Sequence, residues 1–593
     1  MDQREDATSA TSRLPSTEEL IRERLEEERT RLEQELGIES PEIQHFERPA
    51  ERPFTRDQRP HTTVLFGGLT WKHERLIEGG LAGLGYQCEA MPVPDVAAFQ
   101  LGKEYGNNGQ CNPTYFTVGN LVKYLQGLER EGRSRQEILD RYIFVTAGAC
   151  GPCRFGMYEA EYRLALRNSG FDGFRVILFQ QAGGITQSGA EAGLEMDLDF
   201  FLAILNAMNM GDLLNDIGYQ LRPFEVEAGA VDDALAKGME LLYEVLRDKR
   251  TFSRESYVAR LLADRKLGDI TRKAGKFADQ LVTSAYTDAF REVGDVLAGV
   301  RLDRTRVRPI VKITGEFWAQ TTEGDGNYNM FAFLEREGAQ VVVEPVGTWI
   351  MYIIHQAKQM ILDRRHTDED EAMPAAWRLD RRMINELRAR RKNAKLTLAE
   401  AVFKREWQRL RAALNGIPHD LTDQYELQRL GHPYYNSRSG GGEGHLEVAK
   451  NIYYSNKDLC HMVLSLKPFG CMPSTQSDGV QSAVVNHYKD MIYLPIETSG
   501  EGEVNAHSRV QMALGEARLK AREEIERVEE RTGMTLEQAR EFAAEHSYLE
   551  SAMYKVPHTQ GCVGTAANFL IHVAELHAAE SRGRIAVPWG IAR

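Results

Sequence analysis

Four cysteines in three separate segments are the residues of this sequence best suited to hold a metal centre. Cys150 and Cys153 stand in TAGACGPCRFG, between an expected strand and an expected helix. Cys111 in GNNGQCNPTYF and Cys471 in KPFGCMPSTQ also precede expected helices. Helix N-termini stabilise thiolates through free N–H groups and the positive end of the helix dipole. Four thiolates suit a 4Fe–4S cluster, and they also suit zinc.

The same pattern is compatible with other uses of these thiols. CGPC is the dithiol sequence of thioredoxin, whose fold also places it after a strand. Cys150 and Cys153 could therefore form a reversible disulfide, the four thiols could bind a structural zinc as in a scaffold or assembly factor, or the set could be buried and inert. We favour the cluster because the loops lead from strands to helices, where ligands of parallel sheets bind.

Three further cysteines are weaker candidates for ligands. Cys88 lies in an apolar strand and Cys460 in an apolar stretch expected to be helical, so both are expected in the core. Cys562 in HTQGCVGT lies in a glycine-flanked loop before a helix, and it is a candidate further ligand. His558 beside it is expected on the surface or at a helix cap.

Carboxylates and glycines near the expected strand ends receive no catalytic role. Glu316 follows an expected strand, and Asp478, Glu497, Glu501 and Glu503 cluster near the last cysteine loop. Such side chains can act as acids or bases, but they more often cap helices. The glycine-rich GGLTWKH and RSGGGEGHLE match neither the phosphate loop nor the dinucleotide fingerprint, so they are expected to be turns.

The elements that must position the cysteines alternate between strand and helix. Expected strands are TVLFGGLT, YQCEAMPV, RYIFVTAGA and FRVILFQ, with helices over 114–129 and 155–167. A second unit opens at RPIVKITG, passes through a helix near 328–337 to AQVVVEP, and ends with MIYLPIE. The alternation predicts an α/β fold with two doubly wound parallel-sheet units and helical insertions.

Five segments are expected along the chain. They are 1–60, an N-terminal amphipathic helix and linker; 61–230, the first α/β domain with Cys111 and the CGPC loop; 231–307, a helical connector; 308–445, a second α/β unit with a charged helical insertion; and 446–593, a C-terminal α/β segment with Cys471 and closing helices. The N-terminal helix carries an apolar stripe at Leu20, Ile21, Leu25, Leu32 and Leu36. Residues 446–466 are expected to be helical. The charged helices of 350–432 are expected to form a cap, or an intermolecular surface of a homo- or hetero-oligomer.

Composition limits the class of protein. The 593 residues exceed one hydrophobic core, and the net charge of −14 argues against a nucleic-acid partner. No run approaches the ~18 apolar residues of a membrane helix, and the N-terminus lacks the apolar region of a secretory signal. A soluble, cytoplasmic protein is therefore expected. In that reducing compartment, the seven cysteines are not a disulfide framework.

Four segments resemble the 2-hydroxyacyl-CoA dehydratase superfamily, most closely its activase-associated branch, often called CoA enzyme activase-like. They are GNNGQCNPTYFTVGNLVKYL, FVTAGACGPCRFGMYEAEYRLAL, VKITGEFWAQTTEGDGNYNMFAFLEREGAQVVVEP, and LSLKPFGCMPSTQSDGV with LPIETSGEGEVNAHSRVQM. Together they span roughly residues 61–515. The order of the segments is more specific than any one of them.

The resemblance implies Rossmann-like α/β units, an iron–sulfur cluster and an electron-donating partner that hydrolyses ATP. Its ligands would be Cys111, Cys150, Cys153 and Cys471. In dehydratases the cluster passes a low-potential electron to an acyl-CoA thioester, and water is lost through a ketyl radical. The CCG motif of some members is absent, so a six-cysteine double cluster would also need Cys460 and Cys562. Four cysteine ligands leave no iron open to substrate, which favours electron transfer over lyase chemistry.

Overall fold

The computed structural model describes residues 52–148, 153–180, 184–185, 193–248, 283–367 and 379–582, together with isolated positions between Ile21 and Glu35. The chain divides into two compact units, Met1–Glu51 and Arg52–Arg593. In the first unit the described positions are helical, and Ile21, Leu25 and Leu32 of the expected apolar stripe are exposed. Leu20 and Leu36 lie outside the described residues.

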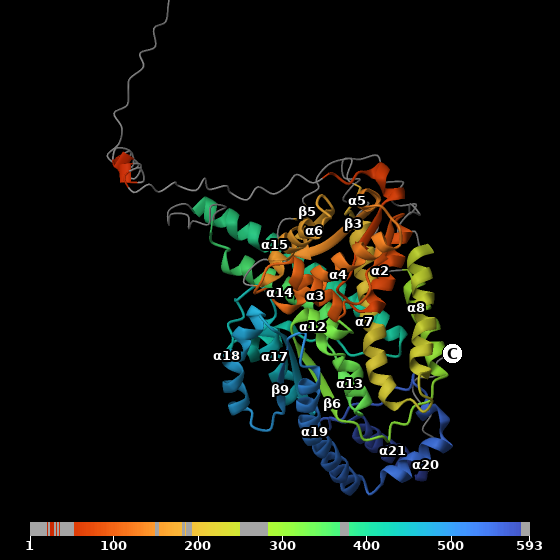
Figure 1. Ribbon diagram of the computed structural model, residues 1–593. Helices are drawn as coiled ribbons and strands as arrows, with labels where there is room; N and C mark the ends of the chain where they lie inside the picture. The colour runs from red at the N-terminus through yellow and green to blue at the C-terminus, as the bar shows by residue number, and fades with distance from the viewer. Residues whose placement is uncertain are drawn as a thin grey trace, which may run out of the picture. The chain divides into compact units, whose positions relative to one another are not determined.

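The first sheet has the strand order β2–β1–β3–β4–β5. Figure 1 labels β3 and β5 of this sheet at the top of the view. Its strands are β1 (Thr63–Phe66), β2 (Gln87–Ala90), β3 (Tyr142–Gly148), β4 (Arg175–Gln180) and β5 (Gly184–Ile185). β1 to β4 are parallel, with Val64 opposite both Cys88 and Ile143, whereas the short β5 runs antiparallel. The strands expected here are therefore present, and the strand order reverses between β1 and β3.

The helices of this first part include α3 and α4, which lie before and after Cys111 in the sequence. The elements are η1 (Arg56–His61), α2 (Trp71–Gly83), α3 (Val96–Tyr105), α4 (Asn112–Arg130), α5 (Arg135–Arg141), η2 (Arg154–Met157), α6 (Tyr158–Asn168), α7 (Leu198–Leu221), η3 (Arg222–Phe224), α8 (Ala230–Asp248) and α11 (Ala285–Ala298). α3 and α4 touch backbone to backbone, because a Cβ at Gly119 would lie 1.8 Å from the carbonyl oxygen of Ala98. Glycine there lets the helices pack closely enough to fix the start of α4. Of the helical connector expected over 231–307, residues 249–282 lie outside the described part.

The second sheet has the order β7–β6–β8–β9, and all its strands are parallel. They are β6 (Ile310–Gly315), β7 (Gln340–Val342), β8 (Met462–Pro468) and β9 (Tyr493–Thr498). Its surrounding elements are α12 (Phe317–Thr321), η4 (Asp325–Asn327), α13 (Met330–Arg336), α14 (Val346–Asp363), α15 (Leu379–Ala413), α16 (Gln424–Gly431), α17 (Gly444–Asn456), α18 (Met472–His487), α19 (Glu503–Thr532), α20 (Leu536–Glu545), η5 (Ser547–Glu550) and α21 (Thr565–Ser581). The expected boundary at 445/446 thus falls between strands of a single sheet.

One element differs from the sequence-based expectation. The helix expected over 446–466 is wrong in its second half, because α17 ends at Asn456 and β8 begins at Met462. Every residue of β8 is buried, so the strand shows no alternation of buried and exposed positions, and its sequence opens with an apolar run. Such a run cannot be told from a buried helix by periodicity. Cys460 accordingly precedes a strand instead of lying in a helix.

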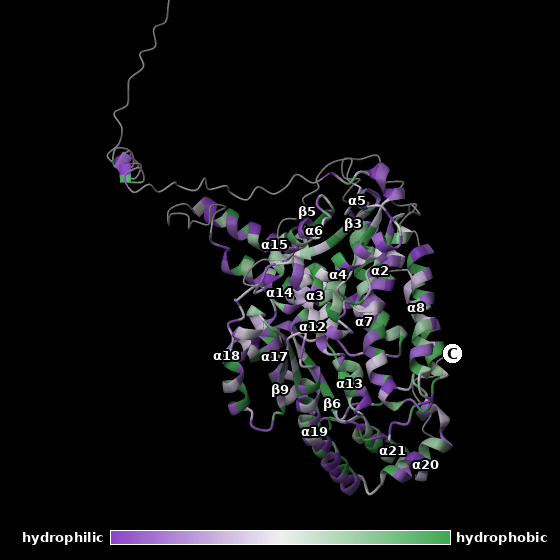
Figure 2. Cartoon of the chain, viewed as in Figure 1, coloured by the Kyte–Doolittle hydropathy of each residue, from purple (hydrophilic) through white to green (hydrophobic). Residues whose placement is uncertain are grey.

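Each sheet packs in a hydrophobic core, and α7 contributes residues to both cores. Leu213 and Ile217 of α7 belong to the core of the first part, whereas Tyr219 packs on Phe331 in the core of the second sheet. Figure 2 shows hydrophilic residues concentrated at the far end of α19. Among the helices of the described part of the chain, none is long and apolar enough to cross a membrane.

Candidate functional site

The loop of Cys111 is held between two helices. Cys111 is the N-cap of α4, and Pro113 occupies the first turn, as the sequence indicates. The thiol is 6% exposed, and its Sγ lies 3.2 Å from Thr114 Oγ1 and 3.2 Å from Tyr158 Oη. Thr114 is one turn into α4 and Tyr158 begins α6, so two helices fix the position of this sulfur.

The loop of Cys471 packs directly on the loop of Cys111. Cys471 is the N-cap of α18, just beyond the end of β8. The N–H of Asn112 donates to the carbonyl of Phe469 at 3.0 Å. At Gly470, where φ is +79°, a Cβ would lie 3.2 Å from the Cα of Cys111. Glycine therefore both permits this turn and lets the two backbones meet.

Cys153 reaches the same region through a third loop. It is the N-cap of η2, and it is partly buried. A Cβ at Gly442, where φ is +92°, would lie 2.4 Å from Pro473 Cγ and 3.6 Å from Cys153 Cβ. The glycine-rich turn before α17 thus lies between Cys153 and the first turn of α18, close to Cys471. Cys150 lies outside the described residues.

Two carboxyl groups accompany the three thiols. Glu316 follows β6 and caps α12, where its Oε2 accepts from the N–H of Ala319 at 3.0 Å. Glu443 Oε2 accepts from the N–H of Phe317 at 2.8 Å. Burial raises the pKa of Glu316 to about 7, and burial together with the charge of Glu316 raises the pKa of Glu443 well above its usual range. Like charges this close do not ionise together readily, so the pair retains a proton near neutral pH.

The thiols of Cys153 and Cys471 are hard to ionise without a cation. Burial raises the pKa of Cys153 to about 12, and the charges of Glu316 and Glu443 add to the effect. Burial and the charge of Glu316 also raise the pKa of Cys471. A reactive dithiol needs the opposite, a depressed thiol pKa. A bound metal would supply the missing positive charge, because coordinating thiols are deprotonated.

Glu447 forms a separate ion pair beside this group. It accepts from the hydroxyl of Ser474 at 2.6 Å and from the hydroxyl of Ser477, and Lys467 Nζ lies 3.5 Å from its Oε2. Lys467 also pairs with Asp478. Asp478, considered as a possible acid or base from the sequence, is thereby engaged in an ion pair.

The donor chemistry of the three loops matches a thiolate-held group. Soft thiolate ligands select iron–sulfur clusters, zinc or Cu(I), and hard cations prefer oxygen. In the described part of the chain, which lacks Cys150, no group of three or more His, Cys, Asp or Glu side chains is arranged to hold a metal ion. The fit therefore rests on the contacts between the loops of Cys111, Cys153 and Cys471 and on the chemistry of their thiols.

The other cysteines occupy different surroundings. Cys88 lies in β2, and its Sγ is 3.6 Å from the carbonyl oxygen of Glu78. Cys460 packs in a small cluster with Ile310 and Val463. Cys562, the candidate further ligand, is buried in the apolar cluster of α19, α20 and α21. The apolar cluster of Cys562 contains none of the residues of the three cysteine loops.

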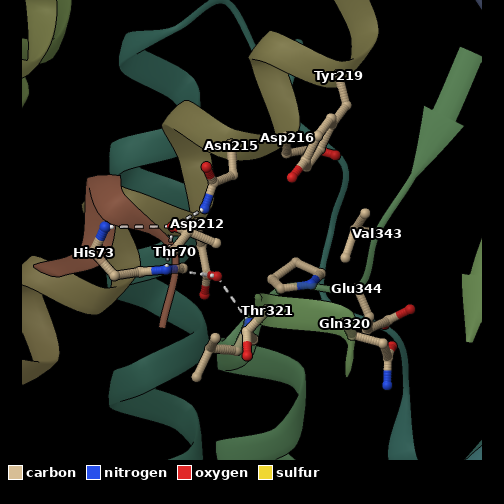
Figure 3. Close-up of a pocket in the computed structure, with 12 residues that line it drawn as sticks. Thr70, His73, Asp212, Asn215, Asp216, Tyr219, Gln320, Thr321, Val343 and Glu344 are labelled. Atoms are coloured by element: carbon tan, nitrogen blue, oxygen red, sulfur yellow. Dashed lines mark hydrogen bonds and ion pairs between the residues drawn. The ribbon is translucent and has the colours of Figure 1, made fainter. Parts of the chain in front are cut away.

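Two small cavities are lined by other residues, and none of the described cysteines forms part of either lining. The first has a volume of about 20 Å³ and is lined by a hydrogen-bond network that the sequence did not reveal. His73 Nε2 donates to Asp212 at 3.0 Å (Figure 3). Asp212 also accepts from the N–H groups of Val346 and Gly347 at 2.8 Å each. Its volume suits a water molecule rather than a substrate. Asp212, a carboxylate inside an apolar helical stretch, was the signal in the sequence that could have revealed it.

The second cavity, of about 30 Å³, lies near the carboxyl end of β1. It is lined by Glu74 and Trp318 among others. Glu74 Oε1 accepts from the N–H groups of Gly68 and Leu69 at 2.9 and 3.1 Å. Burial outweighs these bonds and raises the pKa of Glu74 to about 8. The carboxyl group is therefore largely protonated at neutral pH. No pattern in the sequence indicates this buried glutamate.

Comparison with known proteins does not extend this picture. No protein-family model matches the chain, and no curated protein matches it either. Its function is therefore inferred from the residues of the site.

Proposed function

We propose that the chain holds a 4Fe–4S cluster through Cys111, Cys150, Cys153 and Cys471 and uses it to pass on low-potential electrons. The observation that carries the proposal is the meeting of three cysteine loops from distant parts of the sequence. The contact of Asn112 with Phe469 joins two of them, and Gly442 connects the third. Cys150 stands three residues before Cys153 in the sequence and lies outside the described residues, and we propose that it completes the set of four ligands.

The roles of the residues follow from their positions. Cys111, Cys153 and Cys471 each cap a helical turn, where N–H groups stabilise thiolate charge. Cys111 and Cys471 are buried and Cys153 is partly buried, which limits the access of water to the sulfurs. When bound, a 4Fe–4S cluster supplies one-electron transfer at low potential. Four thiolates close its coordination, which favours relaying electrons over removing water from a substrate.

The wider fold and partners belong to the same proposal. Both sheets are taken as Rossmann-like, doubly wound units, since each strand order reverses once, between β1 and β3 and between β6 and β8. Ligands bind at such reversals, and Glu316 and Cys471 follow β6 and β8 there. By resemblance to the dehydratase superfamily, a separate ATP-hydrolysing protein donates the electron, and the recipient is a second protein or a CoA thioester. We propose a cytoplasmic location on the same resemblance.

Iron and acid-labile sulfide per chain, measured after anaerobic purification and reconstitution, test the proposal. The wild-type chain should be brown and contain about four irons. Cys111→Ser and Cys471→Ser should lose most of the iron. Cys88→Ser and Cys460→Ser are matched controls, since the partly buried Cys88 and the buried Cys460 lie in other clusters, and they should keep it.

The competing functions give different results in the same preparations. A structural zinc site predicts stoichiometric zinc, a colourless protein and unfolding by chelator. A dithiol oxidoreductase predicts a metal-free chain with a reversible Cys150–Cys153 disulfide that does not depend on Cys471. Either pattern, or equal iron in Cys471→Ser and wild type, contradicts the cluster.

A further inference from the structure

The hydroxyl groups of Tyr158 and Thr114 converge on one sulfur. Each oxygen lies 3.2 Å from Cys111 Sγ, within hydrogen-bond range for sulfur. The two hydroxyls come from different helices, α6 and α4, and Tyr158 is 7% exposed. The ring of Phe155 packs edge-on against the ring of Tyr158, with centroids 5.1 Å apart. The arrangement is therefore fixed by packing and shielded from water.

The direction of these hydrogen bonds follows from the chemistry of a ligating sulfur. A thiolate bound to a metal has no proton and can only accept, so both hydroxyls must donate. Each O–H···S bond withdraws negative charge from the sulfur. The reduced form of a cluster carries one more negative charge than the oxidised form, so it gains more from the bonds. Hydrogen bonds to the sulfurs are among the factors that set cluster potentials.

We infer that Tyr158 and Thr114 are positioning residues that raise the reduction potential of the centre held by Cys111, an inference that rests on the proposed function. Neither side chain is a ligand. Among the hydrogen bonds of the described residues, the other cysteine loops have no matching pair of hydroxyl contacts: Cys471 interacts with the single hydroxyl of Ser474, so the sulfur of Cys111 receives the larger effect. The low dielectric of the buried position strengthens both bonds.

Redox titration of the reconstituted protein, followed by paramagnetic resonance, tests this inference. Tyr158→Phe and Thr114→Val should each keep the wild-type iron content and shift the midpoint potential to more negative values. The double variant should shift it further. The matched controls are Tyr162→Phe, one turn later in α6, and Thr117→Val, whose hydroxyl donates to the carbonyl of Pro113 at 2.8 Å. Both controls should leave the potential unchanged.

A measurement on the unaltered chain guards against variants that fold poorly. Exchange of the hydroxyl protons for deuterium should shift an Fe–S(Cys) stretching band in the resonance Raman spectrum of the wild type, and Cys111→Ser should remove that band. Unchanged potentials in the Tyr158 and Thr114 variants, or a deuterium-insensitive spectrum, overturn this inference and leave the cluster standing. A wild-type chain without iron overturns both.

Discussion

The N–H of Asn112 donates a 3.0 Å hydrogen bond to the carbonyl of Phe469, and the Asn112 side-chain amide donates at 2.7 Å to the carbonyl of Thr498. Asn112 directly follows Cys111 in the sequence. Phe469 directly follows β8, and Thr498 is the last residue of β9. One residue thus ties the first cysteine loop to the carboxyl edge of the second sheet. This backbone contact packs the loop of Cys111 against the loop of Cys471.

Loss of the Asn112 side chain should weaken the contact between the Cys111 loop and the second sheet. Asn112→Ala removes one of two donors to the buried carbonyl of Thr498, which still accepts from the N–H of Phe469 at 2.9 Å, so the loss should be roughly 0.5–1.5 kcal/mol in the free energy of unfolding. Urea unfolding measures the loss, and iron per chain should fall with it. Asn168→Ala is the control, because its amide donates to the carbonyl of Tyr105 at an exposed position. Equal iron and stability in Asn112→Ala and wild type would show that the loops do not depend on this residue.

Two glycines of α4 should respond oppositely to alanine. At Gly119 the new Cβ would lie 1.8 Å from the carbonyl oxygen of Ala98, a backbone atom that cannot turn away. Gly119→Ala should therefore cost about 3 kcal/mol or more in unfolding free energy. At Gly127 the nearest atom is 4.0 Å away, so Gly127→Ala should stabilise the helix by up to about 1 kcal/mol. Similar effects of the two changes would contradict the close packing of α3 on α4.

Glu74 should make stability fall as pH rises. Its pKa is about 8 in the folded protein against 4.5 as the ordinary value, so the folded state binds this proton more tightly than the unfolded state. Its contribution is complete below pH 4.5 and is lost as pH rises through 8. Glu74→Gln cannot ionise, and its amide oxygen can still accept from Gly68 and Leu69. The variant should therefore gain on wild type between pH 5 and pH 8.5, by on the order of 3–5 kcal/mol.

Thermal or urea unfolding of the two proteins across that pH range measures the Glu74 effect. Every other titrating group is shared, so its contribution cancels in the difference. Glu104→Gln, at an exposed position of α3, should follow the wild type at each pH. A constant difference between Glu74→Gln and wild type would mean that Glu74 ionises normally.

The buried pair Lys312–Glu344 should be needed as a pair. Lys312 Nζ lies 2.8 Å from Glu344 Oε2, and neither side chain is exposed by more than 3%. Lys312→Met leaves a buried carboxylate without its main cation, a loss of about 3–5 kcal/mol. The double variant Lys312→Met with Glu344→Gln should recover part of that loss, as unfolding in urea would show. A double variant less stable than Lys312→Met alone would argue that other groups neutralise Glu344.

The sequence predicted elements better than it predicted contacts. Cys111 and Cys471 stand before prolines at helix starts, a local signal that the structure reproduces. The sequence pattern predicts a helix where β8 lies, because a strand that is buried on both faces does not alternate between apolar and polar residues. The Glu443 and Tyr158 contacts could not be anticipated, since they depend on how distant loops pack, and no local spacing encodes that. The buried Glu74 and Asp212 were hidden for the same reason.

The low-temperature paramagnetic resonance spectrum of the anaerobic, dithionite-reduced protein tests the central claim most directly. Reduction should give the signal of one reduced 4Fe–4S cluster per chain, absent from Cys471→Ser and retained in Cys460→Ser. A silent spectrum from a chain that carries stoichiometric zinc or no metal would contradict it.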